Sequence, residues 1–251
     1  FTRDAFDVTL TAGTGISAVT GNETYYYGAT VQLGATVKAG YTWKNWTGDL
    51  DLDAQDATFV LEAKAIALTA NATANEYTVT LNAQENGGTP ATQTLTVTFD
   101  ANYTGIDTIK ATKTGWTFDG WYTLATGGTK VTDATKVTTP NHHTLYAHFT
   151  INEYKLTLKV LPDEAYGTTT GTGTYNYNET VAITATANAG YHFVEWQTEA
   201  GERVSTSASY EVTIPVNGLT LVARFAKDTY TIKVVKAGAT AGGNAGIGEV
   251  G

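Results

Sequence analysis

The sequence predicts a mainly β protein: three small modules in tandem in an elongated array, followed by the first strand of a fourth. A glycine with closely spaced aromatic residues after it occurs at 40–46, 115–121 and 190–196, so both intervals are 75 residues long. All five tryptophans of the chain fall inside these three segments. Repetition at the size of a small domain indicates several small folding bodies rather than one large one. The abundance of Thr, Val and Tyr favours strands over helices.

The modules are expected at residues 1–75, 76–151 and 152–227, and residues 228–251 are either the start of a fourth module or a tail. No Pro-rich or Gly/Ser-rich spacer separates them. A short linker limits how far one module can move against the next. The sequence therefore predicts a semi-rigid string of modules.

In the first module, strands are expected at 6–10, 30–37, 59–61 and 68–70, the first two from the alternation of apolar and polar residues. In the aromatic segment Tyr41 and Trp43 have the same parity, whereas Trp46 has the opposite one. A β-bulge or turn is therefore expected between Trp43 and Trp46 if all three rings are to reach one core.

In the second module, strands are expected at 77–81, 95–99 and 145–149, with turns at the glycine pairs 87–88 and 127–128. Residues 105–113 are the least β-like part of this module. We expect a short helix or an irregular crossover there.

The third module repeats the first without an insertion. Tyr175, Gly190 and Trp196 each follow their counterparts in the first module by 150 residues. Its first and last strands are expected at 154–160 and 221–225. A fourth module then begins at 230–234, and a Gly/Ala-rich run ends the sequence.

Composition excludes several classes of partner and chemistry. The net charge of −9, with 15 dispersed Lys and Arg residues, argues against nucleic acid and anionic membrane surfaces, because both require a basic patch. The absence of Cys removes disulfides and thiolate chemistry and fits a protein that works outside a reducing cytosol. No apolar run is long enough to predict a membrane span. Because the chain has no Met, we expect Phe1 to follow a processed signal peptide or a truncation, and the chain to be part of a longer protein.

The central module carries the most specific motifs. They are Tyr77-Thr78-Val79-Thr80-Leu81, Asn86-Gly87-Gly88-Thr89, Thr114-Gly115-Trp116-Thr117-Phe118-Asp119-Gly120-Trp121-Tyr122 and Gly127-Gly128-Thr129-Lys130-Val131. These residues closely resemble the Listeria-Bacteroides repeat, also called the internalin B-repeat. The flanking modules resemble its divergent form, with Tyr-x-Tyr before a Thr-Val strand and then Gly-Tyr-x-aromatic-x-x-Trp. In the central module Ala111 and Thr112 lie in the region where the family usually has a proline before the Thr-Gly pair.

The resemblance extends from residue 6 to about residue 226. It implies β-grasp-like or small all-β modules, found in tandem on secreted and surface proteins of bacteria. It also implies a spacer or partner-binding segment without catalytic activity.

The Trp and Tyr rings are interpreted as core. A module of about 75 residues buries only roughly 60% of its surface on folding, so large rings are the most effective way to build a sufficient core. The alternative is an exposed aromatic platform for sugar rings. Tyr26 is the ligand-binding candidate, because its parity opposes that of Tyr25 and Tyr27.

An acidic run supplies the metal-binding candidate. Asp49, Asp51 and Asp53 alternate like the first ligands of a calcium loop. The pattern then departs from that loop, because no glycine stands at its sixth position and Val60 occupies its twelfth. A solvated acidic loop is the preferred interpretation and calcium the alternative.

Other chemistry-bearing residues give no site. His142, His143 and His148 are close in sequence, but the strand pattern places His148 on the solvent face. Half-exposed packing is expected for His192. The serines Ser17, Ser205, Ser207 and Ser209 stand outside any Gly-x-Ser-x-Gly turn. We therefore predict no catalytic residue, no enzyme activity and no cofactor.

The expected function is a non-catalytic repeat region of a bacterial cell-surface or secreted protein, acting as a stalk or spacer and as an adhesion or protein-interaction segment. One alternative is a carbohydrate-binding adhesin or an accessory module of an extracellular glycosidase. Another is a self-assembling extracellular filament subunit whose residues 228–251 donate a strand to a neighbour. The expected partner is a host, cell-surface or matrix protein or a glycan, with self-association open. Neither nucleic acid nor membrane insertion is expected.

Overall fold

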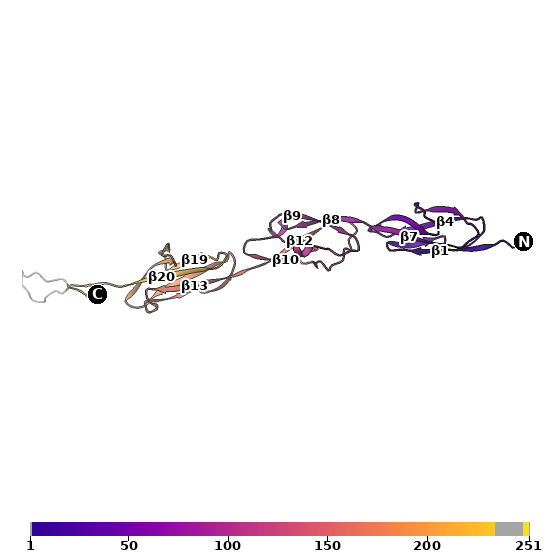
Figure 1. The fold of residues 1–251 in the computed structure, drawn as a ribbon. Coiled ribbons are helices and arrows are strands. Elements are labelled where there is room, and N and C mark those ends of the chain that lie inside the picture. Colours follow the sequence, from indigo (N-terminus) through magenta and orange to yellow (C-terminus); the bar gives the residue numbers. More distant parts are fainter. Residues whose placement is uncertain (1, 234–247, 251) are drawn as a thin grey trace, which may run out of the picture. The chain divides into compact units, whose positions relative to one another are not determined.

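The structure is a computed structural model that describes residues 2–233 and 248–250 (Figure 1). The chain divides into two compact units, Phe1–Lys113 with Phe118–Thr150 and Thr114–Thr117 with Ile151–Gly251. Strands dominate the described residues, and their helical structure is limited to three short 3-10 turns. The protein is therefore mainly β, as predicted, and is built from several small sheets.

The first hydrophobic core lies between two sheets. The strands are β1 (Ala5–Ala12), β3 (Thr24–Tyr26), β5 (Tyr41–Gly48) and β7 (Ile66–Ala74) in the order β3-β1-β7-β5, and β2 (Ile16–Thr20), β4 (Thr30–Val37) and β6 (Ala57–Val60) in the order β2-β4-β6. Alternate residues point to one face of each strand, so Val8 of β1 and Val31 of β4 meet in one cluster with Trp46 of β5.

The second core packs one sheet against loops. Its sheet has the order β11-β10-β12-β8-β9, formed by β8 (Glu76–Asn82), β9 (Thr92–Thr98), β10 (Trp116–Tyr122), β11 (Lys130–Val131) and β12 (His143–Ile151). Two 3-10 turns, η1 (Gln84–Asn86) and η2 (Ile106–Thr108), accompany it. Ile106 in η2 is fully buried in this core, which confirms the short helical crossover expected at 105–113.

The third core again lies between two sheets. One has the order β15-β13-β20-β17-β18, from β13 (Glu153–Leu161), β15 (Gly173–Asn176), β17 (Tyr191–Thr198), β18 (Arg203–Ser205) and β20 (Leu219–Lys227). The other is β14-β16-β19, from β14 (Gly167–Thr170), β16 (Thr180–Ala187) and β19 (Ser209–Thr213), and η3 (Glu164–Tyr166) precedes β14. After β20, β21 (Tyr230–Ile232) pairs with β22 (Gly248–Val250). The Gly/Ala-rich run between them lies outside the described residues.

The three main sheets share one strand plan. The first and last long strands pair in parallel in each: β1 with β7, β8 with β12, and β13 with β20. The strand that carries the aromatic segment lies on the other side of the last strand, as β5, β10 and β17. Each main sheet is therefore mixed, with one parallel pair at its centre. The described residues contain no α-helix to cover it, and a small sheet or loops take that place.

One tryptophan fills each core. Trp46, Trp121 and Trp196 are 0%, 2% and 0% exposed. The bulge predicted before Trp46 is present, because the β5–β7 register shifts between Trp43 and Asn45. The β17–β20 register shifts at the corresponding place, between Phe193 and Glu195.

Candidate functional site

The chain crosses from the first core to the second through a hydrogen-bonded joint. The Asn75 N–H donates to the carbonyl of Gly40 at 2.9 Å, and the Asn75 carbonyl accepts from the Phe99 N–H at 2.9 Å. The Thr42 hydroxyl donates to the side-chain oxygen of Asn75 at 2.6 Å. The Asn75 side chain in turn donates to the Tyr77 hydroxyl at 3.3 Å. A single asparagine thus links a turn, a strand start and the following hairpin.

The same bonds recur around Asn152, inside the second unit. Its N–H donates to the carbonyl of Gly115 at 2.9 Å, and its carbonyl accepts from the Tyr177 N–H at 2.8 Å. The Thr117 hydroxyl donates to its side-chain oxygen at 2.6 Å. The spacing of both asparagines, two residues before the tyrosine at the second position of a strand, is the sequence signal of this joint.

A charged version of this hydrogen-bonded joint follows β20, with Asp228 in the place of the asparagine. The Asp228 N–H donates to the Gly190 carbonyl at 2.9 Å, and His192 stands in the position of the two threonines. Nδ1 of His192 lies 2.9 Å from Oδ1 of Asp228, and the Tyr230 hydroxyl donates to Oδ2 at 3.2 Å. That hydrogen bond to the carboxylate raises the pKa of Tyr230.

Ring contacts reinforce the first joint. Tyr41 packs edge-on against Phe99, with ring centroids 5.5 Å apart, and its hydroxyl donates to Oδ2 of Asp100 at 2.9 Å. Lys136 lies 2.6 Å from the other oxygen of Asp100. Hydrogen bonds from Lys136 and Tyr41 hold the pKa of Asp100 below its usual range, and burial followed by the bond to Asp100 raises the pKa of Tyr41. Tyr41 is not part of the first core, because its ring packs on Phe99 and lies beside Gly15; the three rings of the aromatic segment therefore do not all reach one core.

The ligand-binding candidate Tyr26 lies at the edge of the first core. Tyr25 packs against that core, whereas Tyr26 and Tyr27 are 57% and 63% exposed. A surface pocket beside them is lined by Thr2, Arg3, Asp4, Tyr26, Tyr27, Gly28 and Ala29. The parity of Tyr26 is as expected, but Tyr27 is exposed as well.

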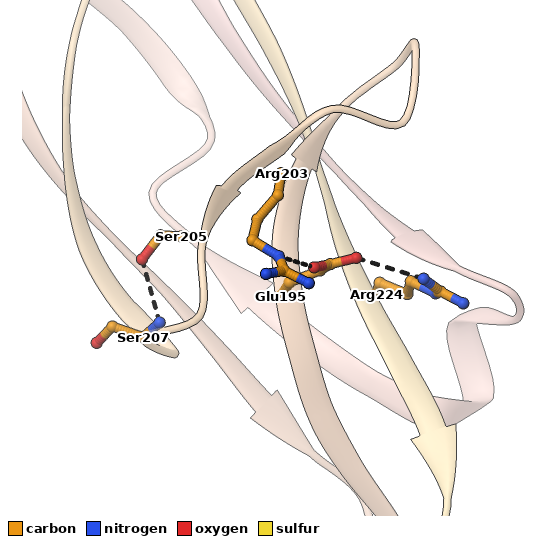
Figure 2. Close-up of polar contacts among 5 residues, drawn as sticks. All are labelled: Glu195, Arg203, Ser205, Ser207 and Arg224. Carbon is orange, nitrogen blue, oxygen red and sulfur yellow. Dashed lines mark hydrogen bonds and ion pairs between the residues drawn. The ribbon is translucent and has the colours of Figure 1, made fainter.

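Glu195 is the buried charged residue of the described part of the chain, and sequence reasoning did not single it out. It stands at the bulge beside Trp196, with its side chain 8% exposed. Figure 2 shows its carboxylate between two guanidinium groups: Arg203 Nε at 2.6 Å and Arg224 Nη1 at 3.3 Å. Chiefly the hydrogen bond from Arg203, with Arg224 adding to it, lowers the pKa of Glu195. Both oxygens are occupied by protein groups, so the arrangement is an internal ion pair.

The acidic run of the first module and the residues after it hydrogen-bond to the indoles of Trp43 and Trp46 through backbone carbonyls. The carbonyl of Asp53 accepts from the indole N–H of Trp43 at 2.7 Å, and the carbonyl of Gln55 accepts from that of Trp46 at 3.2 Å. The Asp49 carboxylate accepts from the backbone N–H of Ala67 at 2.8 Å. Within residues 2–233 and 248–250, no three His, Cys, Asp or Glu side chains gather as a possible metal site; this includes Asp49, Asp51 and Asp53.

The histidines are dispersed among separate contacts. His142 Nδ1 accepts from the Thr78 N–H at 2.8 Å, and His143 Nε2 lies 2.6 Å from the Tyr103 hydroxyl. His148 stacks on Tyr122 with ring centroids 3.9 Å apart. Each ring thus serves local packing.

Comparison with known proteins explains why the joints repeat. The profile of the divergent InlB B-repeat domain matches residues 6–76 and 156–229, more than half of the chain. The profile of the Listeria-Bacteroides repeat domain matches residues 77–148. The chain belongs to the InlB B-repeat family. The first, second and third cores each lie within one matched B-repeat, which confirms the resemblance found in the sequence.

One curated relative of this chain is internalin H of Listeria monocytogenes serovar 1/2a (strain ATCC BAA-679 / EGD-e). It is 38% identical over 120 residues, which cover 45% of this chain and 20% of that protein. The matched segment thus spans about a fifth of the relative's length. Among solved structures, the Bacillus anthracis TIE protein matches with a TM-score of 0.31 and 9% identity, covering 88% of this chain and 50% of that one. A likeness at that level carries no functional argument.

Family membership indicates a repeat region of the internalin type. The described residues include no helix with the length and apolar character needed to cross a membrane.

Proposed function

We propose that this B-repeat region is a spacer of a bacterial surface protein, in which each repeat is a separate β-grasp-like folding body and the joints limit bending. The joint chemistry carries the proposal. The turn, the asparagine and the next hairpin are bonded in the same way at Asn75 and Asn152. The three hydrogen bonds shared by Asn75 and Asn152 restrict the chain at this point, whereas a flexible linker would make no such bonds.

The cores support separate folding. Each B-repeat has its own buried tryptophan, whose indole N–H is accepted by a backbone carbonyl of the same repeat: Gln55, Ile109 and Ala208. A core that is complete within one repeat does not require its neighbours for burial.

Small-angle scattering of the full chain tests this role. A compact globule of this length would have a radius of gyration of about 18 Å, while three repeats in line would give about 28 Å. A value near the larger figure supports the spacer, and a value near the smaller one overturns it. Asn75→Ala is expected to broaden the distance distribution, because it removes the side-chain bonds of Asn75 to Thr42 and Tyr77.

A second candidate function is carbohydrate binding at Tyr26. The favouring observation is the exposed Tyr26 and Tyr27 pair beside Arg3 and Asp4, since sugar rings pack on exposed aromatic faces and hydrogen-bond to charged groups. Titration with glycans should then change tyrosine fluorescence in the wild type, and calorimetry should show that Tyr26→Ser abolishes binding while Tyr26→Phe retains it. No fluorescence change across a broad glycan set would remove this candidate.

A further inference from the structure

Two adjacent histidines stand at the start of the last long strand of the second B-repeat. The strand register gives the equivalent positions in the three main sheets: Ile66 opposite Val8, His143 opposite Val79 and Leu219 opposite Leu156. With the preceding residue, the pairs at this place are Ala65-Ile66, His142-His143 and Gly218-Leu219. Only the second of the three B-repeats therefore has titratable side chains here.

His142 accepts a hydrogen bond that only a neutral ring can accept. The backbone N–H of Thr78 donates to Nδ1 of His142 at 2.8 Å. A backbone N–H cannot accept, so Nδ1 must carry a lone pair and the ring proton must lie on Nε2. A proton on Nδ1 would place two donors against each other. The neutral ring thus fastens the start of β12 to β8.

His143 is also held as an acceptor. Its Nδ1 lies 2.9 Å from the carbonyl of Asn141, and its Nε2 lies 2.6 Å from the hydroxyl of Tyr103. Because a carbonyl can only accept, Nδ1 donates and Nε2 takes the hydrogen bond from Tyr103. Tyr103 is 5% exposed, and burial raises the pKa of its hydroxyl, which therefore keeps its proton. If Nε2 were protonated, the buried hydroxyl would have no other acceptor among the described residues.

The other two of the four histidines face acceptors. Nε2 of His148 lies 2.9 Å from the carbonyl of Leu124, and Nδ1 of His192 lies 2.9 Å from the carboxylate of Asp228. A protonated ring can still donate to a carbonyl or a carboxylate. Protonation is consequently compatible with the contacts of these two histidines, whereas it breaks a contact of His142 and one of His143.

No opposite charge compensates a proton on either ring. The titratable side chains in contact with His142 and His143 are Tyr77 and Tyr103, both edge-on to the imidazoles. The charged residues of the segments packed around them are Glu76 in β8, Asp100 and Asp107 in the loop region after β9, and Asp133 and Lys136 in the loop before β12. Within residues 2–233 and 248–250, no ion pair joins any of them to His142 or His143.

We propose that His142 and His143 form an acid-sensitive switch, which holds the start of β12 to β8 and to Tyr103 when both rings are neutral and releases these contacts when the rings take up protons. The folded repeat keeps the rings neutral, whereas the unfolded chain binds protons near about pH 6.5. The contribution of the two contacts to stability is therefore complete above that pH and declines below it. Mild acid would loosen the second B-repeat and leave the first and third intact. The switch does not depend on the spacer role.

Amide hydrogen exchange of the full chain, read separately for each B-repeat, tests the switch between about pH 7.5 and about pH 5.5, a range in which most carboxylates stay ionised. Rates are corrected for the intrinsic effect of pH on exchange. Below about pH 6.5 the opening equilibrium constant of the second repeat should rise by up to about tenfold per pH unit for each ring held neutral. The first and third repeats should show no such rise. The amide of Thr78 should lose its protection with the second repeat or before it.

Matched variants identify the groups responsible. His142→Gln and His143→Gln retain a side-chain acceptor that does not titrate in this range, so the double variant should lose the pH dependence. His148→Gln, in the same repeat, is the control and should retain it. Protection of the second repeat that stays constant in the wild type, or a pH dependence that survives in the folded double variant, overturns the proposal.

A titration of the wild type decides the matter if the double variant does not fold. The ring signals of His142 and His143 in nuclear magnetic resonance spectra are followed together with the exchange of the Thr78 amide. Protonation of His142 should coincide with the loss of protection at Thr78. Protonation of both rings while Thr78 remains protected overturns the switch.

Discussion

The hydroxyl of Tyr41 donates a 2.9 Å hydrogen bond to the carboxylate of Asp100, a residue that belongs to the next B-repeat. Lys136, also of the second repeat, holds the other carboxylate oxygen. An ionised Asp100 thus joins an aromatic strand of one repeat to a loop of the next. The joint between these two repeats consequently has an electrostatic component that can be titrated.

Acid is expected to weaken this joint through Asp100. Its pKa is lowered in the folded protein by Lys136 and Tyr41, so its contribution to stability is complete above the usual carboxyl range, near pH 4, and is lost as the pH falls through the lower folded value. Urea unfolding of the wild type and Asp100→Asn between pH 2 and pH 7 measures this. The difference in the free energy of unfolding should shrink below about pH 4. A difference independent of pH would show that ionisation of Asp100 plays no part.

Two glycines with the same backbone conformation allow the backbone strain of a substitution to be measured apart from its steric clash with a neighbouring ring. Gly40 has φ +86° and Gly190 has φ +85°, but a Cβ on Gly40 would meet the ring of Phe99 at 2.4 Å while one on Gly190 would meet no described atom within 4 Å. Gly190→Ala should therefore cost only the left-handed backbone penalty of about 1–2 kcal/mol. Gly40→Ala should cost about 1–3 kcal/mol more, because the ring must move. Equal losses in chemical denaturation would contradict the packing of Phe99 on Gly40.

The spacing of glycines and aromatic residues was enough to predict the core. The parity conflict between Trp43 and Trp46 predicted a bulge, and burial of large rings is an effective way for so small a repeat to gain apolar area. The bulge and the buried Trp46 follow from rules that act within one strand. These rules are local and can be applied to a sequence.

The joints could not be predicted in the same way. Parity says which side of a strand Tyr41 occupies, but not that the ring reaches Phe99 in another repeat. Asn75 was visible only as part of a short linker, because its role depends on three groups distant in sequence. The sequence of the acidic run suggested a role for its carboxylates. In the structure it is the backbone carbonyl of Asp53 that accepts a hydrogen bond from the indole of Trp43, and a sequence does not show where a backbone carbonyl points.

Removing the central tryptophan of a repeat should unfold that repeat alone. Trp196→Ala and Trp121→Ala are each expected to cost about 3–5 kcal/mol, as a fully buried ring leaves a large cavity. Trp43→Ala is the matched control in a half-buried position and should cost less. Calorimetry should resolve one destabilised transition with the others unchanged. An unchanged melting profile for Trp196→Ala would remove the assignment of that ring to the core.

The ion pair at Glu195 is expected to stabilise the third B-repeat more than an exposed ion pair of the same repeat does. Glu195→Gln keeps the shape of the side chain but removes the charge that faces Arg203 and Arg224, leaving two guanidinium groups beside a neutral amide. The control is Glu199→Gln, which removes an exposed ion pair with Lys159 and should have little effect. Because the pKa of Glu195 is lowered in the folded state, the stabilisation from its ion pair should be complete above the usual carboxyl range and decline as the pH falls through the lower folded value.

Thermal unfolding of both variants at neutral and acidic pH measures this. At neutral pH Glu195→Gln should melt well below Glu199→Gln, and the gap should close in acid. Two variants that melt together at neutral pH would show that solvent already screens the buried carboxylate as effectively as an exposed one.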